Sequence, residues 1–318
     1  MKNGMAAFPS RVGCWFLCGC AGAADTDSFP EETGIESDGS ADSDGPADSE
    51  GSETGSLDSD TAASAPYCAI TETWIECPHQ ELGIPLFGEA SDRRVFYAEP
   101  LGEPPADGWP YVLLFQGSYF PAENFWSAEP GVPWGGWYQA LAVAALLDAG
   151  FAVITPETRY SGSTFWDTNV SPWNVAWTTS GDHSLMLEIF DRIEAGEFGA
   201  LDTDQAFAAG LSSGGYMTSR MAVSYPGRFQ ALAIHSASYA TCIGSLCALP
   251  ALPEDHPPTL FLHGELDDIV PVWTMTAYAD VLSEQGTAVE VSVDAESGHE
   301  WIAEDPQRLR DWFIAHGS

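Results

Sequence analysis

The chain has 318 residues, of which 45% are hydrophobic, enough to build a sizeable core and too many for a wholly disordered protein. It carries 47 acidic and 10 basic residues, and this formal net charge of -37 argues against nucleic acid and other polyanions as partners. The acidic residues and the apolar residues are unevenly spread. They divide the chain into residues 1–20, 21–64 and 65–318.

Residues 1–20 have the pattern of a signal peptide. Lys2 and Arg11 precede a short apolar run, Val12–Cys18, which is too short to span a bilayer. The run ends in Leu-Cys-Gly-Cys, which resembles the lipobox of bacterial lipoproteins and implies cleavage and lipid attachment at Cys20. The alternative is an ordinary signal peptide that contains cysteines. We expect a secreted protein, held at the cell surface or outer membrane only through this lipid anchor.

Residues 21–64 are predicted to form an acidic, disordered linker. Between Asp25 and Ser64 lie 13 acidic residues and no Lys or Arg, among mostly Ser, Gly, Thr, Ala and Pro. Such a segment cannot bury enough apolar surface to offset the entropy lost on ordering, and its like charges extend it. An acidic calcium-binding tail is the alternative, but the segment lacks the ligand spacing of a calcium loop.

Residues 65–318 have a length that suits one catalytic domain, which we expect to be a monomer. Four of the seven cysteines lie there, and an even number in an exported chain predicts two disulfides. Three pairings are open, and the short loops favour Cys68–Cys77 and Cys242–Cys247. A zinc site is the alternative, but paired C-x-x-C spacing is missing. We expect neither a metal nor another cofactor.

Short apolar runs alternate with helical stretches along this domain. The runs predict strands of a parallel sheet covered on both faces, and an alternating run before them predicts an antiparallel edge strand. The apolar runs are Tyr111–Phe115, Phe151–Thr155, Gln205–Ala209, Ala231–Ile234, Thr259–Leu262 and Val289–Val293, and the alternating run is Arg93–Ala98. The helical stretches are Trp137–Ala149, Asp182–Ala195, Gly215–Tyr225, Trp273–Gln285 and Pro306–Ala315. This order predicts an α/β fold with a mainly parallel sheet flanked by helices.

A glycine-rich turn joins the predicted strand Gln205–Ala209 to the helix that follows it. The turn reads Gly-Leu-Ser-Ser-Gly-Gly, which matches the G-x-S-x-G nucleophile elbow of the α/β-hydrolase fold. A serine on such a strained turn needs neighbours without side chains, here Gly210 and Gly214. The turn also places the hydroxyl at a helix N-terminus, which favours a developing anion. Ser212 is therefore the predicted nucleophile.

In this fold the acid and the histidine follow the serine, each just after a strand. The segment after Thr259–Leu262 resembles the H-G-x-x-D-x-x-V-P segment of such hydrolases, which selects Asp267 as the acid over Asp268. The last predicted strand is followed by Gly298-His299, and we expect Gly298 to allow a tight turn that returns His299 over the sheet edge. The other histidines after Ser212 lack this context; they are His235, His256, His263 and His316.

The predicted triad of Ser212, His299 and Asp267 cleaves esters through an acyl-enzyme. Neutral or slightly higher pH should be preferred, because His299 must be unprotonated to accept the serine proton. Two backbone N–H groups must hold the oxyanion. The predicted donors are those of Ser213 and of Ser118, which lies in the loop after Tyr111–Phe115.

The stretch from Gly210 to Tyr239 resembles extracellular polyhydroxyalkanoate depolymerases and the related feruloyl and acetylxylan esterases. In these proteins G-L-S-x-G-G is followed by a helix and then by Tyr-Pro-x-x-Phe, and a weaker resemblance runs from Arg93 to the end. The family implies a secreted hydrolase of polymeric or polymer-linked esters. The chain departs from the family pattern at Gln116, where many relatives have histidine. We also expect no separate C-terminal substrate-binding domain, and this weakens the case for an insoluble polymer.

Many of the 12 tryptophans follow the C-terminal ends of predicted strands. We expect them to rim an apolar cleft at the active site, although they could instead pack the long loops against the domain. They are Trp126, Trp134, Trp166, Trp173, Trp177, Trp273 and Trp301. The predicted substrate contacts are Tyr119, Trp166 and Trp301.

The sequence therefore favours a serine esterase that acts on a neutral or apolar ester, with a polyester as the preferred substrate. A carbohydrate esterase that releases feruloyl or acetyl groups is the first alternative. A serine peptidase is less favoured, because no charged specificity pocket is evident. A non-catalytic surface lipoprotein is favoured only if a member of the triad is missing, and all three are present.

Overall fold

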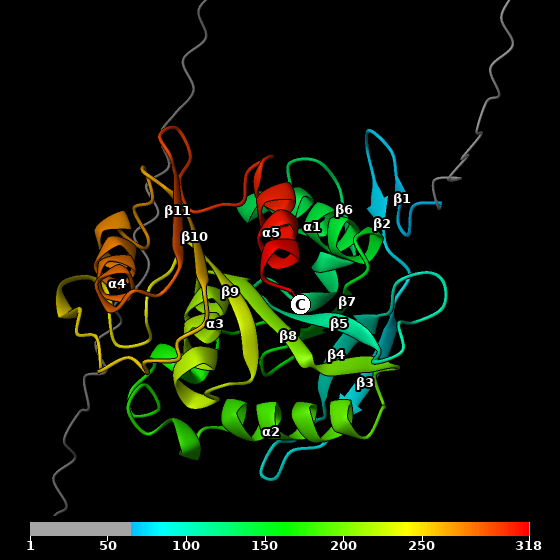
Figure 1. The fold of residues 1–318 in the computed structure, drawn as a ribbon, viewed down its shortest axis with the longest axis horizontal. Helices are drawn as coiled ribbons and strands as arrows, with labels where there is room; N and C mark the ends of the chain where they lie inside the picture. Colours follow the sequence, from blue (N-terminus) through cyan, green and yellow to red (C-terminus); the bar gives the residue numbers. More distant parts are fainter. Residues whose placement is uncertain (1–64, 318) are drawn as a thin grey trace, which may run out of the picture. The chain divides into compact units, whose positions relative to one another are not determined.

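The computed structural model describes residues 65–317 (Figure 1). The predicted signal peptide, Cys20 and the acidic linker lie outside the described residues. Within residues 65–317, no helix is long and apolar enough to cross a membrane.

A central sheet of eight strands organises the domain (Figure 1). The strands are β3 (Gln80–Ile84), β4 (Arg93–Ala98), β5 (Trp109–Phe115), β7 (Ala152–Pro156), β8 (Leu201–Leu211), β9 (Phe229–His235), β10 (Thr259–Gly264) and β11 (Val289–Asp294). Their order in the sheet is β11-β10-β9-β8-β5-β7-β4-β3. Six neighbouring strands run parallel, namely β11, β10, β9, β8, β5 and β7. Strand β4 is antiparallel to both of its neighbours, β7 and β3. The six predicted parallel strands and the antiparallel strand are confirmed; β3 was not predicted.

Five helices cover the two faces of the sheet. They are α1 (Gly136–Asp148), α2 (Gly181–Glu194), α3 (Ser213–Ser224), α4 (Val272–Gln285) and α5 (Asp305–His316). Helices α1 and α5 pack on one face, whereas α2, α3 and α4 pack on the other. The crossover helices keep successive strands parallel, so the C-terminal ends of β5, β8, β10 and β11 meet at one edge. This edge carries the residues predicted to be catalytic.

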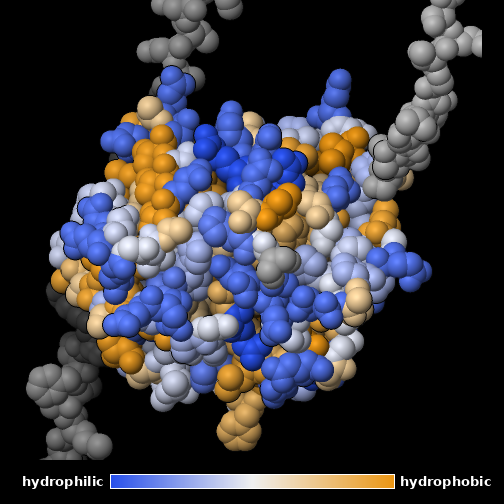
Figure 2. Space-filling model, in the orientation of Figure 1, coloured by the Kyte–Doolittle hydropathy of each residue, from blue (hydrophilic) through white to orange (hydrophobic). Residues whose placement is uncertain are grey.

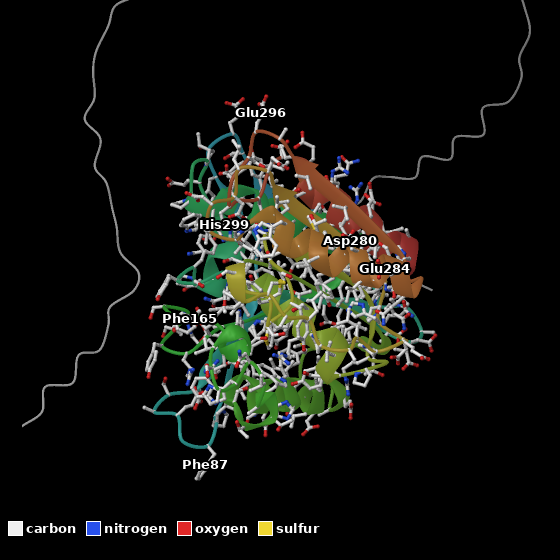
Figure 3. All side chains as sticks on the ribbon, turned by 90° about the vertical axis from the view of Figure 1, so that its left-hand side faces the viewer. Phe87, Phe165, Asp280, Glu284, Glu296 and His299 are labelled. Carbon is white, nitrogen blue, oxygen red and sulfur yellow. A yellow bond between two sulfur atoms is a disulfide. The ribbon has the colours of Figure 1, made fainter. Side chains whose placement is uncertain are left out.

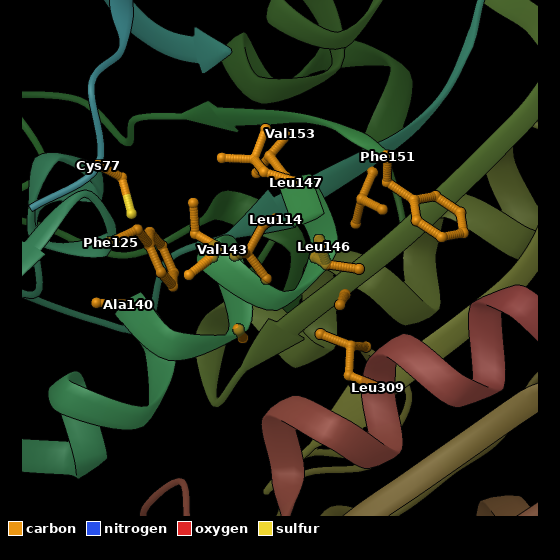
Figure 4. Close-up of a cluster of buried hydrophobic side chains, with 14 of the residues drawn as sticks. Cys77, Leu114, Phe125, Ala140, Val143, Leu146, Leu147, Phe151, Val153 and Leu309 are labelled. Atoms are coloured by element: carbon orange, nitrogen blue, oxygen red, sulfur yellow. The ribbon is translucent and has the colours of Figure 1, made fainter. Parts of the chain in front are cut away.

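The inner strands bury both of their faces, which explains their continuous apolar sequences, whereas the edge strands β3 and β11 are partly exposed. On β5, Leu114 packs with α1 and α5, while the next-door Leu113 packs with α2 and α3. Figure 4 shows the cluster of buried side chains on the α1 and α5 face, with Leu146 of α1 and Leu309 of α5 beside the sheet. Phe151 completes it with its ring edge-on to Phe207, at a centroid distance of 5.4 Å.

A second, small sheet lies at the N-terminal side of the domain. It consists of β1 (Ala69–Ile70), β2 (Ile75–Glu76) and β6 (Ser127–Ala128). Cys68 is bonded to Cys77 across the β1–β2 hairpin, and Cys242 is bonded to Cys247 in the loop after β9. Both pairs are those that the short loops favoured.

The surface reflects the acidic composition. Hydrophilic residues cover much of the face shown in Figure 2, and a hydrophobic group gathers near the edge strand β11. Val291 and Val293 of that strand are exposed. The catalytic edge lies at another side, and Figure 3 shows His299 and Phe165 there, opposite Asp280 and Glu284 of α4.

Candidate active site

Ser212 occupies the turn between β8 and α3. Its backbone has φ 56° and ψ -121°, a conformation that a residue with a side chain rarely adopts. The backbone N–H of Ser212 donates to the carbonyl of His235, at 3.0 Å, and its carbonyl accepts from the N–H of Tyr216, at 2.9 Å. These bonds hold the strained turn in place at the start of α3.

Gly210 and Gly214 are required by close backbone approach. A Cβ atom at Gly210 would lie 2.5 Å from the carbonyl carbon of Gly214, and one at Gly214 would lie 2.6 Å from the carbonyl oxygen of Gln116. Any side chain at either position would therefore force the strand, the helix and the β5 loop apart. The prediction that both glycines serve the geometry of the elbow is confirmed.

Asp267 and His299 meet at the ends of β10 and β11. The Nδ1 atom of His299 lies 2.7 Å from Oδ2 of Asp267, and both side chains are largely buried. The other carboxylate oxygen, Oδ1, accepts the backbone N–H groups of Ile269 and Val270 at 3.0 and 2.8 Å. The neighbouring Asp268 is exposed. The contact therefore selects Asp267 as the partner of His299.

His263 gives the carboxylate a further donor. Its Nε2 atom lies 2.8 Å from the carbonyl oxygen of Val270 and 3.3 Å from Oδ2 of Asp267. Because a carbonyl oxygen can only accept, Nε2 must carry the proton. Burial alone would raise the pKa of Asp267, but hydrogen bonds from His263 and His299 outweigh it and hold that pKa below its usual range. Asp267 is thus kept ionised beside the His299 imidazole.

The turn that carries His299 is built differently from our prediction. Gly298 does not adopt a left-handed conformation. Instead, the carboxylate of Asp294 accepts the backbone N–H groups of Glu296 and Ser297 at 3.0 and 2.7 Å. An aspartate can close such a turn by itself, so a positive φ at the glycine is unnecessary.

Gly264 brings the acid loop and the histidine loop together. A Cβ atom there would lie 2.6 Å from the carbonyl carbon of Ser297, and the N–H of Leu266 donates to the carbonyl of Ser297 at 3.1 Å. The two loops therefore pack backbone to backbone, with no space for a side chain between them.

His235 connects the nucleophile to the histidine loop. Its carbonyl holds Ser212, as described above, and its Nε2 atom lies 2.8 Å from Oδ2 of Asp305. The ring of Trp301 stacks on the His235 ring at 5.1 Å and 15°. Both sides of the buried His235 ring are therefore occupied by contacts other than Ser212 or Asp267.

The loop after β5 carries Ser118, the second predicted oxyanion donor. A Cβ atom at Gly117 would lie 3.9 Å from Cβ of Ser212, so this loop passes beside the nucleophile. Gln116 is fully buried; its amide nitrogen donates to the carbonyl of Gly162 at 2.8 Å, and its amide oxygen accepts the N–H of Thr158 at 3.1 Å. Gln116, which departs from the family pattern, thus holds the loop after β5 to the segment after β7 through its two side-chain hydrogen bonds.

Two predicted substrate contacts, Trp166 and Trp301, are wrong. Trp166 is 0% exposed and Trp301 is 2% exposed. Their rings fill the space beneath the loops, because long connections without a separate cap must bury apolar groups of their own. Trp126 and Trp177 are buried in the same way, which corrects the predicted rim of seven tryptophans.

An exposed apolar rim remains at the catalytic edge, and it includes the predicted contact Tyr119 and two of the seven predicted tryptophans, Trp134 and Trp273. Tyr119 is 68% exposed, and its ring lies edge-on to Phe165 at 6.2 Å. Trp134 lies edge-on to His299 at 5.9 Å. The sequence placed Trp134 in the rim but could not show this contact, because the two residues are 165 positions apart in the chain. The exposed apolar residues in the loop after β10 and at the start of α4 are Leu266, Ile269 and Trp273.

Within residues 65–317, no group of three or more His, Cys, Asp or Glu side chains is placed to hold a metal ion.

Comparison with known proteins decides the family. A poly(3-hydroxyoctanoate) depolymerase from Pseudomonas fluorescens is 44% identical to this chain over 250 residues, which span 78% of this chain and 85% of that protein. The chain belongs to this depolymerase family. It is a carboxylic ester hydrolase with the α/β-hydrolase fold, as the sequence predicted.

Other similarities to the depolymerase-family chain are more local or more distant. An acetylxylan esterase A from Neosartorya fischeri is 36% identical over 96 residues, or 30% of this chain and 25% of that protein. The prolyl oligopeptidase family model matches residues 247–315. The crystal structure of a thermostable esterase superimposes with a TM-score of 0.56 at 16% identity, over 76% of this chain and 63% of that one. At that identity the likeness concerns the fold alone.

Proposed function

We propose that this chain hydrolyses an apolar polyester, with Ser212 as nucleophile, His299 as base and Asp267 as the acid that orients it. The match to a poly(3-hydroxyoctanoate) depolymerase over most of both chains carries the proposal. The hydrogen bond between His299 and Asp267 and the strained turn of Ser212, at one sheet edge, support the assignment of roles.

In the first half of the reaction, Oγ of Ser212 attacks the ester carbonyl while His299 takes its proton. Because Nδ1 of His299 is hydrogen-bonded to Asp267, the serine proton is transferred to Nε2 of His299. The backbone N–H groups of Ser213 and Ser118 stabilise the oxyanion. His299 then returns the proton to the leaving alcohol, and an acyl-Ser212 ester remains.

Water completes the cycle. His299 removes a proton from the water as it attacks the acyl-enzyme, and the proton returns to Ser212 when the acid product leaves. Asp267 stays ionised throughout, and its charge stabilises the imidazolium that forms in each half-reaction.

The acetylxylan esterase match supports a second candidate, release of acetyl groups from xylan. Incubation of the purified protein with poly(3-hydroxyoctanoate) film and with acetylated xylan separates the two. We expect soluble 3-hydroxyoctanoate products from the film, and little acetate from the xylan. The reverse result would assign the chain to carbohydrate esters.

The exposed rim is expected to mediate adsorption to the polyester surface. Changing Tyr119 and Trp273 together to serine removes two exposed aromatic groups, each worth about 1.5–3 kcal/mol if fully buried against an apolar surface. Since about 1.4 kcal/mol is a factor of ten, film hydrolysis relative to hydrolysis of soluble p-nitrophenyl butyrate should fall at least tenfold.

Phe87→Ser is the matched control for the rim variant. Phe87 is fully exposed but projects from the β3–β4 connection, away from His299 (Figure 3). It should leave the ratio of film to soluble activity unchanged. An equal loss in the control would show a general effect of surface hydrophobicity, and an unchanged ratio in the rim variant would remove the rim from the proposal.

We also propose that residues 1–20 direct export, that Cys20 is lipidated, and that residues 21–64 tether a monomeric domain of residues 65–318 to the cell surface or outer membrane. The lipobox-like sequence and the two disulfides support this. Cys20→Ser should move the protein from the membrane fraction to the medium. Equal membrane retention of both forms would contradict lipid anchoring.

A further inference from the structure

Trp166 lies between the two segments that carry the proposed oxyanion donors. Its backbone N–H donates to Oγ of Ser213 at 2.9 Å, and its indole Nε1–H donates to the carbonyl of Gln116 at 3.0 Å. The ring is 0% exposed and stands edge-on to Phe115, at 5.4 Å and 81°. One residue thus contacts the start of α3 through its backbone and the end of β5 through its side chain.

The segment around Trp166 is held in place from behind. The backbone N–H of Asp167 donates to Oδ2 of Asp182 at 2.6 Å, and Arg159 forms an ion pair with Asp167. The same segment also grips the β5 loop at a second point, where the N–H of Tyr119 donates to the carbonyl of Thr164 at 2.8 Å. Trp166 therefore sits on a fixed support, so its two bonds fix the loops relative to each other.

We propose that Trp166 is a positioning residue that sets the separation of the Ser213 and Ser118 N–H groups in the oxyanion hole. This inference rests on the proposed function. An oxyanion donor is effective only at about 2.7–3.1 Å from the developing charge. The indole bond to Gln116 fixes the peptide plane before Gly117, which in turn orients the N–H groups that follow. The hydrogen bond from the Trp166 backbone N–H to Oγ of Ser213 holds the start of α3, which carries the other N–H donor.

Trp166→Phe tests this inference, because it retains a buried ring and the backbone N–H but removes the indole donor. We expect kcat for p-nitrophenyl butyrate to fall about 10- to 100-fold, less than the loss of about 10²–10³ for removal of a whole oxyanion donor, with KM within about twofold. Affinity for an alkyl trifluoromethyl ketone, whose adduct carries the oxyanion, should fall by the same factor as kcat/KM.

Trp126→Phe is the matched control. Trp126 is equally buried, and its Nε1–H donates to Oγ1 of Thr155 at 2.7 Å, within the core between α1 and the sheet. Both variants lose one indole bond and the same volume, so their melting temperatures should fall by similar amounts. Only Trp166→Phe should lower kcat and ketone affinity.

Ser213→Ala provides a second variant that changes little volume. It removes the acceptor of the Trp166 N–H but keeps the Ser213 N–H, and we expect kcat to fall about 3- to 10-fold at constant KM. If Trp166→Phe and Ser213→Ala leave kcat and ketone affinity at the level of Trp126→Phe, the inference is overturned. If Ser212→Ala is also active, the proposed function fails with it; if that variant is inactive, only the role of Trp166 is lost.

Discussion

A Ser212→Ala variant should lose roughly 10⁴- to 10⁶-fold in kcat on every ester that the parent cleaves. The reason is that no acyl-enzyme can form without Oγ, and only the binding site and the oxyanion donors remain to assist water. The turn itself should survive, because the backbone bonds of Ser212 to His235 and Tyr216 do not involve the side chain. Release of p-nitrophenol from the butyrate ester measures the loss.

Labelling with a fluorophosphonate probe provides the control for that result. The parent should be labelled at Ser212, whereas Ser212→Ala should be unlabelled and should melt within a few degrees of the parent. Activity of the variant within tenfold of the parent, or labelling of the parent at another serine, would overturn the assignment of the nucleophile.

Asp267→Asn is expected to lower kcat by about 10³- to 10⁴-fold. The amide introduced there can turn its oxygen or its nitrogen toward His299, and the fixed tautomer that leaves Nε2 unprotonated is lost. The buried site also loses the negative charge that stabilises the imidazolium. Rates for p-nitrophenyl butyrate at pH 7 to 9 test this result.

Asp268→Asn is a matched control, because it makes the same chemical change one residue along, at an exposed position. Its kcat should stay within twofold of the parent. Comparable losses at Asp267 and Asp268 would mean that the loop as a whole is disturbed. A large loss at Asp268 alone would make that residue the acid.

Stability gives a second readout for Asp267. Its pKa is held below the usual value, so the carboxylate stabilises the fold at pH values above the unfolded pKa of about 3.9, and this contribution is lost as the pH falls through the folded pKa. The difference in free energy of unfolding between the parent and Asp267→Asn should therefore narrow below about pH 4. If this difference in free energy of unfolding stays constant as the pH falls below about 4, the charge of Asp267 does not stabilise the fold and the prediction is wrong.

The sequence predicted the sheet well where strands are buried on both faces. Such strands have short, continuous apolar runs, as in Thr259–Leu262, and each is closed by glycine or a polar residue. β3 was missed because Gln80–Ile84 is a mostly exposed edge strand with two polar residues and a glycine. The small sheet was missed because two-residue strands leave no periodicity to detect.

Local motifs were enough to predict the backbone geometry around Ser212, but they did not predict which loop aromatic residues are buried. Ser212 is framed by glycines that the backbone itself requires. Trp166 and Trp301 follow strands just as Tyr119 does, yet only Tyr119 faces solvent. Which aromatic side chain of a long loop turns inward depends on contacts with segments far away in the sequence, such as that between Trp301 and His235.

In the loop that carries Asp267, the backbone holds the carboxylate, whereas two neighbouring side chains are free to vary. Ile269 donates its backbone N–H to Asp267, while its side chain and that of Leu266 point into solvent. Substitutions at Leu266 and Ile269 can therefore change which substrate surfaces the enzyme binds, while the carboxylate of Asp267 keeps its position. Substrate preference could drift among relatives, or be selected in a library, at sites adjacent to the acid and at little cost in turnover.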